Sequence, residues 1–219
     1  MKTCVQIIAS TCACCLILIF SGCENDGLNH NFGNNDPNLI LALGDSITAG
    51  YGVSGAEAYP SQLARMTGQN VINAGVNGAL SWDAPPRFES YITQYNPGYV
   101  LILYGANNVT YRSTEDTPET LLAIALRAKE LRMIPVMATL PTAYRDADHA
   151  TETGLLNERI RALARSNNIR LADLERDFGD NRALVSSDGL HPTAEGMRII
   201  AISFMTAMQS RVGGRPGRK

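Results

Sequence analysis

Two short stretches near opposite ends of the 219-residue chain carry side chains that could act together as a nucleophile and its base. Gly44-Asp45-Ser46 follows an apolar run, and Asp188-Gly189-Leu190-His191-Pro192 precedes a helical pattern. A serine hydroxyl becomes an effective nucleophile when a base takes its proton and a third group orients that base. Asp188 and His191, three positions apart on one loop, can contact each other directly. If the two stretches meet in the fold, their residue types suit a nucleophile, a base and an orienting carboxylate, although Gly44-Asp45-Ser46 alone is too short to decide.

Each stretch also has an ordinary structural interpretation. Asp45 and Ser46 are residue types that cap helices, and His191 would then be incidental to an exposed capping loop. The same Asp-x-x-His spacing recurs at Asp146-Ala147-Asp148-His149 without the following proline. We interpret that second copy as a polar loop near the substrate entrance rather than as a catalytic or metal site.

The segments between these stretches predict an α/β fold. Apolar runs typical of strands buried on both faces recur at 39–43, 70–74, 99–104, 134–140 and 169–174. Helical stripes lie between and after them, the clearest at 197–208, and Thr117-Pro118 is typical of a helix start. Alternating strands and helices predict a three-layer α/β/α sandwich with a five-stranded parallel sheet. In such sheets the active site lies at the carboxyl ends of the strands.

Composition limits the possible classes of protein. The chain is 45% hydrophobic and 18% charged, as a globular domain is, and its formal net charge is −2. A general nucleic-acid binder would need a basic face, so we expect no nucleic-acid partner. The length suits one domain with its own core.

The N-terminal segment is typical of an export signal. Lys2 precedes an uncharged stretch with a continuously apolar core at 13–20, and small residues follow at Ser21-Gly22. We predict a signal peptide at 1–22, with an uncleaved membrane anchor as the alternative. The cysteines all lie in this region, with no His or acidic residue among them, so we expect no metal site there: Cys4, Cys12, Cys14, Cys15 and Cys23.

The residues that follow predict how the chain is attached. Phe20-Ser21-Gly22-Cys23 resembles a bacterial lipoprotein box, with Phe20 where Leu is usual, which makes Cys23 a candidate for lipidation. Residues 23–38 are rich in Asn, Asp and Gly and predict a flexible tether. The folded domain is predicted at 39–212, with a basic tail at 213–219. We expect an exported protein, lipid-anchored in the bacterial cell envelope, with a soluble secreted or periplasmic form as the alternative.

Four sequence blocks resemble those of the SGNH, or GDSL, hydrolase family. In chain order they are Gly44-Asp45-Ser46, Asn73-Ala74-Gly75-Val76-Asn77-Gly78, Gly105-Ala106-Asn107 and the Asp188–Pro192 stretch. The segments at 41–51 and 140–144 are similar to the branch that holds thioesterase I/lysophospholipase and arylesterases. The resemblance implies a flavodoxin-like fold and ester hydrolysis through an acyl-enzyme, with no metal and no organic cofactor. It implies the roles of nucleophile, base and orienting carboxylate for Ser46, His191 and Asp188.

The resemblance also implies roles for further residues. The backbone amides of Ser46 and Gly78 and the side-chain amide of Asn107 would form the oxyanion hole. Asn108 departs from the family pattern G-x-N-D, and we expect a local rearrangement rather than loss of activity. Three aromatic residues are candidates to line the acyl pocket, with surface or core packing as the alternative: Tyr51, Trp82 and Tyr144.

The function predicted from these observations is that of an exported serine esterase. Its substrate would be a small-molecule or lipid ester of the aryl or acyl ester, lysophospholipid or thioester type. A carbohydrate O-acetylesterase of the same fold is the alternative within enzymes. A non-catalytic envelope binding protein is a further alternative, but a binding protein has no need for Ser46, Asn107, Asp188 and His191 together.

Overall fold

The computed structural model describes residues 30–210, so the predicted signal peptide, Cys23 and the basic tail lie outside the described residues. Within that range one sheet of parallel strands has the order β2-β1-β3-β4-β5. The predicted five-stranded parallel sheet is confirmed. The strands are β1 (Asp36–Gly44), β2 (Asn70–Gly75), β3 (Pro97–Leu103), β4 (Ile134–Ala138) and β5 (Arg170–Ala172).

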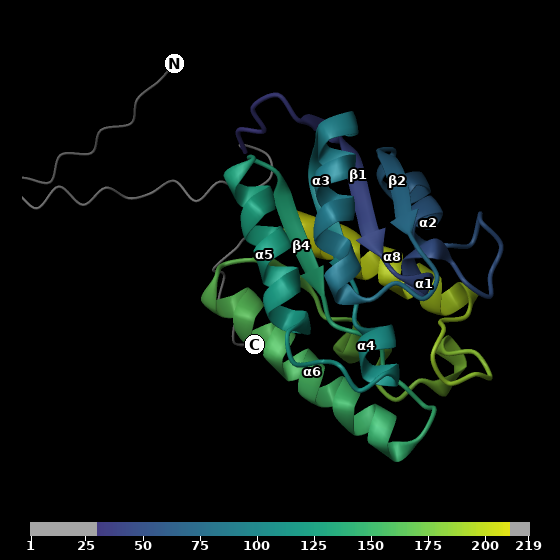
Figure 1. The fold of residues 1–219 in the computed structure, drawn as a ribbon. Helices are drawn as coiled ribbons and strands as arrows, with labels where there is room; N and C mark the ends of the chain where they lie inside the picture. Colours follow the sequence, from purple (N-terminus) through teal and green to yellow (C-terminus); the bar gives the residue numbers. More distant parts are fainter. Residues whose placement is uncertain (1–29, 211–219) are drawn as a thin grey trace, which may run out of the picture.

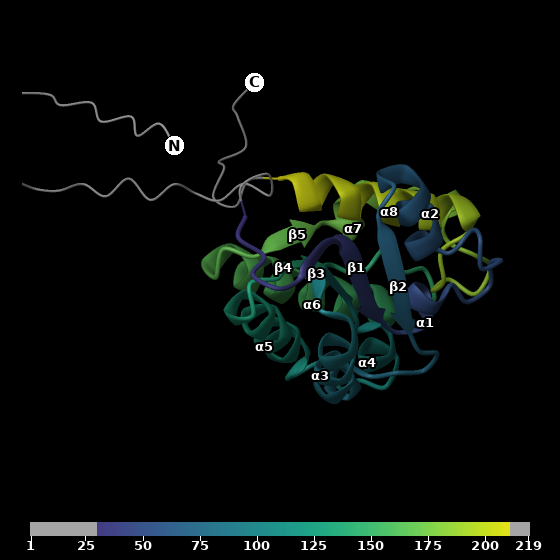
Figure 2. The same ribbon diagram turned by 90° about the horizontal axis from the view of Figure 1, so that it is seen from above.

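Helices cover both faces of this sheet, as the two views of the ribbon show (Figures 1 and 2). One face carries α3 (Ala84–Tyr95), α5 (Thr117–Glu130) and α6 (Ala147–Ser166). The other carries α2 (Tyr59–Thr67), α7 (Leu174–Phe178) and α8 (Ala194–Gln209). Short elements lie in the connections: α1 (Ser46–Ala49), α4 (Ala106–Thr110) and the 3₁₀ turns η1 (Ser81–Asp83) and η2 (Arg182–Leu184).

The core lies between the sheet and its two helical layers. Every residue of β3 and β4 is buried, because helices cover both faces of these central strands. The predicted stripe on α8 is buried against the sheet through Met197, Ile200 and Phe204. Burying a side chain of this size is worth roughly 1.5–3 kcal/mol each. Within residues 30–210 no helix is long and apolar enough to cross a membrane.

The described fold begins before residue 39. Strand β1 starts at Asp36, inside the segment predicted as a tether. The side chain of Asn35 donates to the carbonyl oxygen of Leu131 at 2.7 Å, and the Phe32 ring lies 5.5 Å from that of Tyr99. These contacts fix the chain at the amino ends of the strands, and polar composition alone does not reveal them.

The start of α5 also differs from the prediction by one residue. Asp116 takes the N-cap position, and Thr117 lies in the first turn. The Thr117 hydroxyl is hydrogen-bonded at 3.2 Å to that of Ser81 on η1 instead of capping the helix. This buried contact joins α5 to the loop after β2.

Candidate active site

The carboxyl ends of three neighbouring strands bring the motif residues to one edge of the sheet. Gly44 at the end of β1 is in register with Gly75 of β2 and Leu103 of β3. Helix α1 starts one residue after β1 (Figure 1), and α4 starts shortly after β3. The α1 backbone passes so close to β2 that a Cβ atom on Gly75 would lie 2.0 Å from the Ala49 nitrogen. Only glycine permits this approach.

Ser46 is the first residue of α1. The preceding Asp45 caps that helix, its Oδ1 accepting a hydrogen bond from the Ile47 amide at 3.0 Å. The Ser46 hydroxyl lies 2.9 Å from Nε2 of His191. The predicted capping role of Asp45 and the predicted contact of Ser46 with a base are therefore present together.

The loop before α8 supplies the other two members of this chain of hydrogen bonds. Nδ1 of His191 lies 2.6 Å from Oδ2 of Asp188. If Nδ1 carries the ring proton and donates it to this carboxylate, Nε2 is free to accept the Ser46 hydroxyl proton, which is the tautomer that a general base requires. The structure thus brings Ser46, His191 and Asp188 into one linear array.

The Asp188 carboxylate is held by further donors. Its Oδ1 accepts from the Ser186 hydroxyl at 2.7 Å, from the Leu190 amide at 2.8 Å and from the His191 amide at 2.9 Å. Burial opposes ionisation, but the hydrogen bonds from His191, Leu190 and Ser186 outweigh it and hold the pKa of Asp188 well below its usual range. Sequence reasoning missed Ser186, although a hydroxyl two residues before an aspartate is a recognisable local partner.

The second Asp-x-x-His copy, at Asp146–His149, lacks the contact between aspartate and histidine ring that Asp188 and His191 make. In both copies the aspartate accepts from the backbone amide of the histidine, at 2.8 Å in the Asp146–His149 pair. The His149 ring, however, turns away from Asp146 toward the hydroxyl of Thr110, 3.4 Å from Nε2. The segment is the N-cap and first turn of α6, so the predicted polar loop is wrong for residues 147–149. Burial, reinforced by the nearby Arg145, lowers the pKa of His149.

The proposed oxyanion donors lie on the loops that follow β2 and β3. Gly78 is exposed and has φ +78°, a conformation that favours glycine. The side-chain amide of Asn107, on α4, donates to the carbonyl oxygen of Ala79 at 2.8 Å. One N–H of Asn107 therefore fixes its orientation beside the Gly78 loop, and its second N–H is available to a substrate oxygen.

Asn108 is fully buried and uses both ends of its side-chain amide. Its Oδ1 accepts from the Ser81 amide, and its Nδ2 donates to the carbonyl oxygen of Ser113, each at 3.0 Å. An aspartate could accept the first bond but, when ionised, could not donate the second. This arrangement gives a local reason for the departure from G-x-N-D and ties η1 to the segment after α4.

Arg87 of α3 joins the carboxyl ends of β1, β2 and β3. Its guanidinium donates to the carbonyl oxygens of Gly44 and Ala74 and to the hydroxyl of Tyr104. Gly44 is the last residue of β1, Ala74 is the last but one of β2, and Tyr104 directly follows β3. Sequence reasoning missed Arg87 because nothing in its helix shows that three carbonyl and hydroxyl groups converge there.

The three aromatic candidates lie in different surroundings. The Tyr51 ring packs on the His191 ring with centroids 4.4 Å apart. Trp82 is half-exposed and borders a groove next to Gly78, with a volume of about 510 Å³. Tyr144 lies under the Arg182 guanidinium, and its amide donates to the carbonyl oxygen of Gly189. Tyr144 therefore packs against the loop of the catalytic array.

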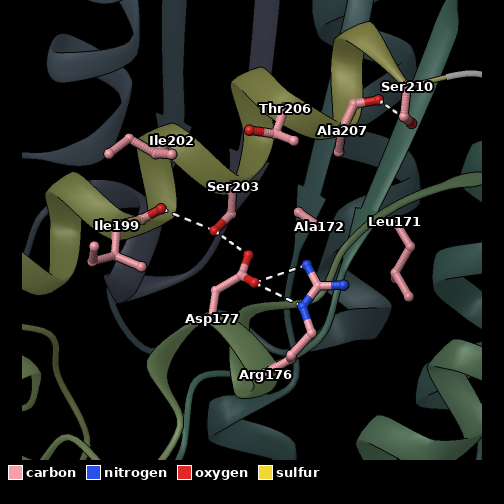
Figure 3. A pocket seen from close by; sticks show the side chains of 10 residues that line it. All are labelled: Leu171, Ala172, Arg176, Asp177, Ile199, Ile202, Ser203, Thr206, Ala207 and Ser210. Carbon is pink, nitrogen blue, oxygen red and sulfur yellow. Dashed lines mark hydrogen bonds and ion pairs between the residues drawn. The ribbon is translucent and has the colours of Figure 1, made fainter. Parts of the chain in front are cut away.

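A second hollow, between β5, α7 and α8, has a volume of about 450 Å³ (Figure 3). Asp177 faces it but is paired with Arg176 at 2.8 Å and accepts from the Ser203 hydroxyl at 2.6 Å. The Ser203 hydroxyl also lies 2.9 Å from the Ile199 carbonyl oxygen, an alternative acceptor for its single proton. Arg176, Asp177 and Ser203 are thus paired with one another, and the hollow lies three strands away from β1 in the sheet order.

The comparisons with known proteins agree with this geometry. A model of the GDSL-like Lipase/Acylhydrolase family matches residues 42–199, and the chain belongs to that family. The resemblance inferred from the four blocks is therefore confirmed. The chain is 30% identical over 110 residues to "Thioesterase 1/protease 1/lysophospholipase L1" of Escherichia coli, a match covering 48% of this chain and 53% of the relative. The chain thus spans about half the length of that curated relative.

Solved structures show the same fold. A G-D-S-L family lipolytic protein from Desulfitobacterium hafniense aligns with a TM-score of 0.70 and 22% identity, covering 78% of this chain and 99% of that one. An acetylxylan esterase from Geobacillus stearothermophilus aligns with a TM-score of 0.67 and 20% identity, covering 83% and 99%. At these identities the likeness defines the fold.

Proposed function

We propose that the chain is a serine esterase in which Ser46, His191 and Asp188 form the catalytic triad. The observation that carries the proposal is the array of hydrogen bonds at 2.9 Å and 2.6 Å that joins these three side chains at the carboxyl edge of the sheet. All three residues lie within the range 42–199 that the family model matches. This geometry is that required of a nucleophile, its general base and the group that orients the base.

Acylation follows from the positions of these atoms. The Ser46 Oγ attacks the ester carbonyl carbon as its proton passes to Nε2 of His191. Negative charge then develops on the carbonyl oxygen, where the amides of Ser46 and Gly78 and the side chain of Asn107 can donate. The bond to the leaving alcohol breaks, and the proton on Nε2 passes to the leaving oxygen.

Deacylation repeats these steps with water as the nucleophile. His191 takes a proton from water, which attacks the acyl carbon, and Ser46 leaves with the proton from Nε2. Asp188 remains ionised throughout, and its carboxylate stabilises the imidazolium in both steps. The low pKa of Asp188 supports this role.

The acyl group and the alcohol define two candidate substrate classes. The curated relative supports a lipid or acyl ester, lysophospholipid or thioester. The groove beside Gly78 supports an acetylated carbohydrate as the second candidate, because Trp82 borders it as an exposed indole together with the polar Asn77 and Asp83. An exposed aromatic face with flanking polar groups suits a sugar ring, and the acetylxylan esterase neighbour has the same fold.

An acyl-chain series separates these candidates. Rates on 4-nitrophenyl esters from acetate to palmitate should be measured beside release of acetate from acetylated xylan, with Ser46→Ala as the blank. Activity that extends to long acyl chains supports the lipid-type esterase, and activity limited to acetate together with release from xylan supports the O-acetylesterase. No ester hydrolysis above that of Ser46→Ala would contradict the proposed function.

We further propose that the enzyme is exported and anchored through Cys23. The apolar core at 13–20 and the lipobox-like residues before Cys23 support this proposal. The chain enters the fold at Asp36, at the opposite end of β1 from Ser46 (Figure 1). The eight steps from Asp36 to Gly44 place the two ends of β1 about 26 Å apart. An anchor at Cys23 would therefore join the domain on the side away from the active site.

Mass spectrometry of the mature N-terminus tests this attachment. A lipidated Cys23 as first residue, lost in Cys23→Ser, is the expected result, since at least two acyl chains are needed for stable anchoring. A cleaved end without lipid would indicate a soluble secreted or periplasmic enzyme. An intact Met1 would indicate an uncleaved anchor.

A further inference from the structure

The catalytic imidazole is covered on one face by a tyrosine from the nucleophile's own turn. The rings of Tyr51 and His191 have centroids 4.4 Å apart and planes inclined by 38°. Tyr51 is 52% exposed, whereas the His191 side chain is only 14% exposed. The tyrosine therefore shields the histidine from solvent. Tyr51 itself is not part of the hydrophobic core, and its ring packs on the His191 ring instead.

The backbone that places Tyr51 is tied to the nucleophile. The amides of Gly50 and Tyr51 both donate to the carbonyl oxygen of Ser46, at 3.1 Å and 3.0 Å. Gly50 has φ +87°, and a Cβ atom there would lie 2.5 Å from that of Ala58, so the chain can turn in this way only at a glycine. The position of the Tyr51 ring is thus set by the same short helix that sets Ser46.

The other contacts of His191 lie in the plane of its ring. Nε2 faces the Ser46 hydroxyl, and Nδ1 faces the Asp188 carboxylate, the charged group in direct contact with the ring. Arg182 contacts the same loop, but it donates to the carbonyl oxygens of Val185 and Ser186 and not to the His191 ring. Rotation of the ring about its Cβ–Cγ bond would break both of the in-plane hydrogen bonds, to Ser46 and to Asp188. A ring packed against the face of the imidazole restricts that rotation.

We propose that Tyr51 is a positioning residue for His191, which holds the imidazole plane in the line between Ser46 and Asp188 and favours the imidazolium that forms during attack. The inference rests on the role proposed above for His191. An aromatic face attracts a cation, and an exposed contact of this kind corresponds to a change of roughly two- to fivefold in an equilibrium or rate. The Tyr51 hydroxyl has no part in this role, so a phenylalanine at position 51 should perform it equally well.

The test compares Tyr51→Leu and Tyr51→Phe with a matched control. Tyr95→Leu removes another exposed tyrosine that packs on a ring, that of Tyr91 at 6.1 Å, but it lies at the end of α3 on the opposite edge of the sheet. On 4-nitrophenyl acetate, we expect kcat of Tyr51→Leu to fall roughly two- to fivefold with KM unchanged. Tyr51→Phe and Tyr95→Leu should retain the wild-type kcat.

A second measurement does not depend on catalysis. The chain has three histidines, so NMR can follow the His191 ring protons directly in the intact chain. In Tyr51→Leu the His191 ring protons should lose the ring-current shift that the Tyr51 ring imposes, and in Tyr51→Phe they should keep it.

The outcomes separate this inference from the proposed function. Wild-type kcat and unchanged His191 ring-proton shifts in Tyr51→Leu would overturn the positioning role while leaving the triad intact. A change in KM alone would also overturn it, because Tyr51 would then be a substrate contact. If the wild-type chain hydrolysed no ester, the proposed function would fail, and the NMR comparison of the His191 ring protons would still decide whether Tyr51 packs on the imidazole.

Discussion

The side chain of Asn107 and the carbonyl oxygen of Ala79 are joined by a hydrogen bond of 2.8 Å that spans the loops after β3 and β2. The bond fixes the amide plane of Asn107 before any substrate is present. It also sets the distance between Asn107 and the loop that carries Gly78. An oxyanion hole built from two separate loops is thereby organised in advance, which is the condition under which such donors are effective.

Replacement of Asn107 by alanine should therefore lower turnover far more than substrate affinity. An oxyanion donor acts where charge develops in the transition state, and loss of one costs roughly 3 kcal/mol, or at least about a hundredfold in rate. Steady-state kinetics of Asn107→Ala on a short-chain aryl ester give both kcat and KM. A change confined to KM would show that Asn107 only positions the substrate.

Ser46→Ala and His191→Ala should each abolish ester hydrolysis without unfolding the protein. The nucleophile and its base act as a unit, so either loss removes the shared pathway. The assay needs protein free of other esterases, with circular dichroism to check the fold. His149→Ala is the matched control, since it removes the histidine of the same spacing whose ring faces Thr110, and it should keep most activity. Equal loss in His149→Ala and His191→Ala would show that the base is wrongly assigned.

The fold was predictable from sequence because its signals are local and repeated. Short continuous apolar runs such as Tyr99–Leu103 are typical of strands buried on both faces, and they occur between helical stripes. The predicted start of the domain at Leu39 was less accurate. The contact of Asn35 with Leu131, which orders the chain before that point, depends on a residue far away in sequence.

The candidate site was predictable in part for the same reason. Ser46, Asp188 and His191 stand in short motifs that can be read residue by residue. Arg87 and Tyr51 act through the spatial convergence of separate segments, which spacing does not show. The two Asp-x-x-His copies illustrate the limit, because both make the same backbone hydrogen bond but only in the copy at Asp188 and His191 does the histidine ring turn to its aspartate.

Asn108→Asp restores the usual family residue but should destabilise this protein. The carboxylate would face the Ser113 carbonyl oxygen, which now accepts from the amide, in a fully buried position. A buried charge without a partner costs several kcal/mol, so we expect roughly 2–4 kcal/mol less free energy of unfolding at pH 8. Urea denaturation measures the difference, with the exposed Asn70→Asp as control.

The pH dependence of this loss gives an internal check. At acidic pH the introduced carboxyl group is protonated and can donate to Ser113, so the loss should shrink. An equal loss at both pH values would point to a steric cause. No loss at either would mean that the hydrogen bond to Ser113 is not required.

Asp45 should make the folded protein less stable as pH rises from about 4 to about 7. Burial raises the pKa of Asp45 to about 7, although the amides of Ile47 and Ala106 partly offset this effect. Among the described residues, its Oδ2 is buried without a hydrogen-bond partner. The pKa of Asp45 is higher in the folded than in the unfolded protein, so protonated Asp45 adds to the free energy of unfolding. This contribution is complete in acid and is lost as the pH rises through the folded pKa.

Asp45→Asn should remove this dependence, because the amide does not ionise. A shift from 3.8 to about 7 corresponds to at most roughly 4 kcal/mol. The free energy of unfolding of the variant relative to the wild type should therefore rise by up to that amount between pH 4 and pH 8. Urea denaturation across this range measures the slope, with Asp180→Asn, at an exposed position, as control. Parallel pH profiles for Asp45→Asn and the wild type would show that the Asp45 carboxyl group ionises as readily in the fold as in the unfolded chain.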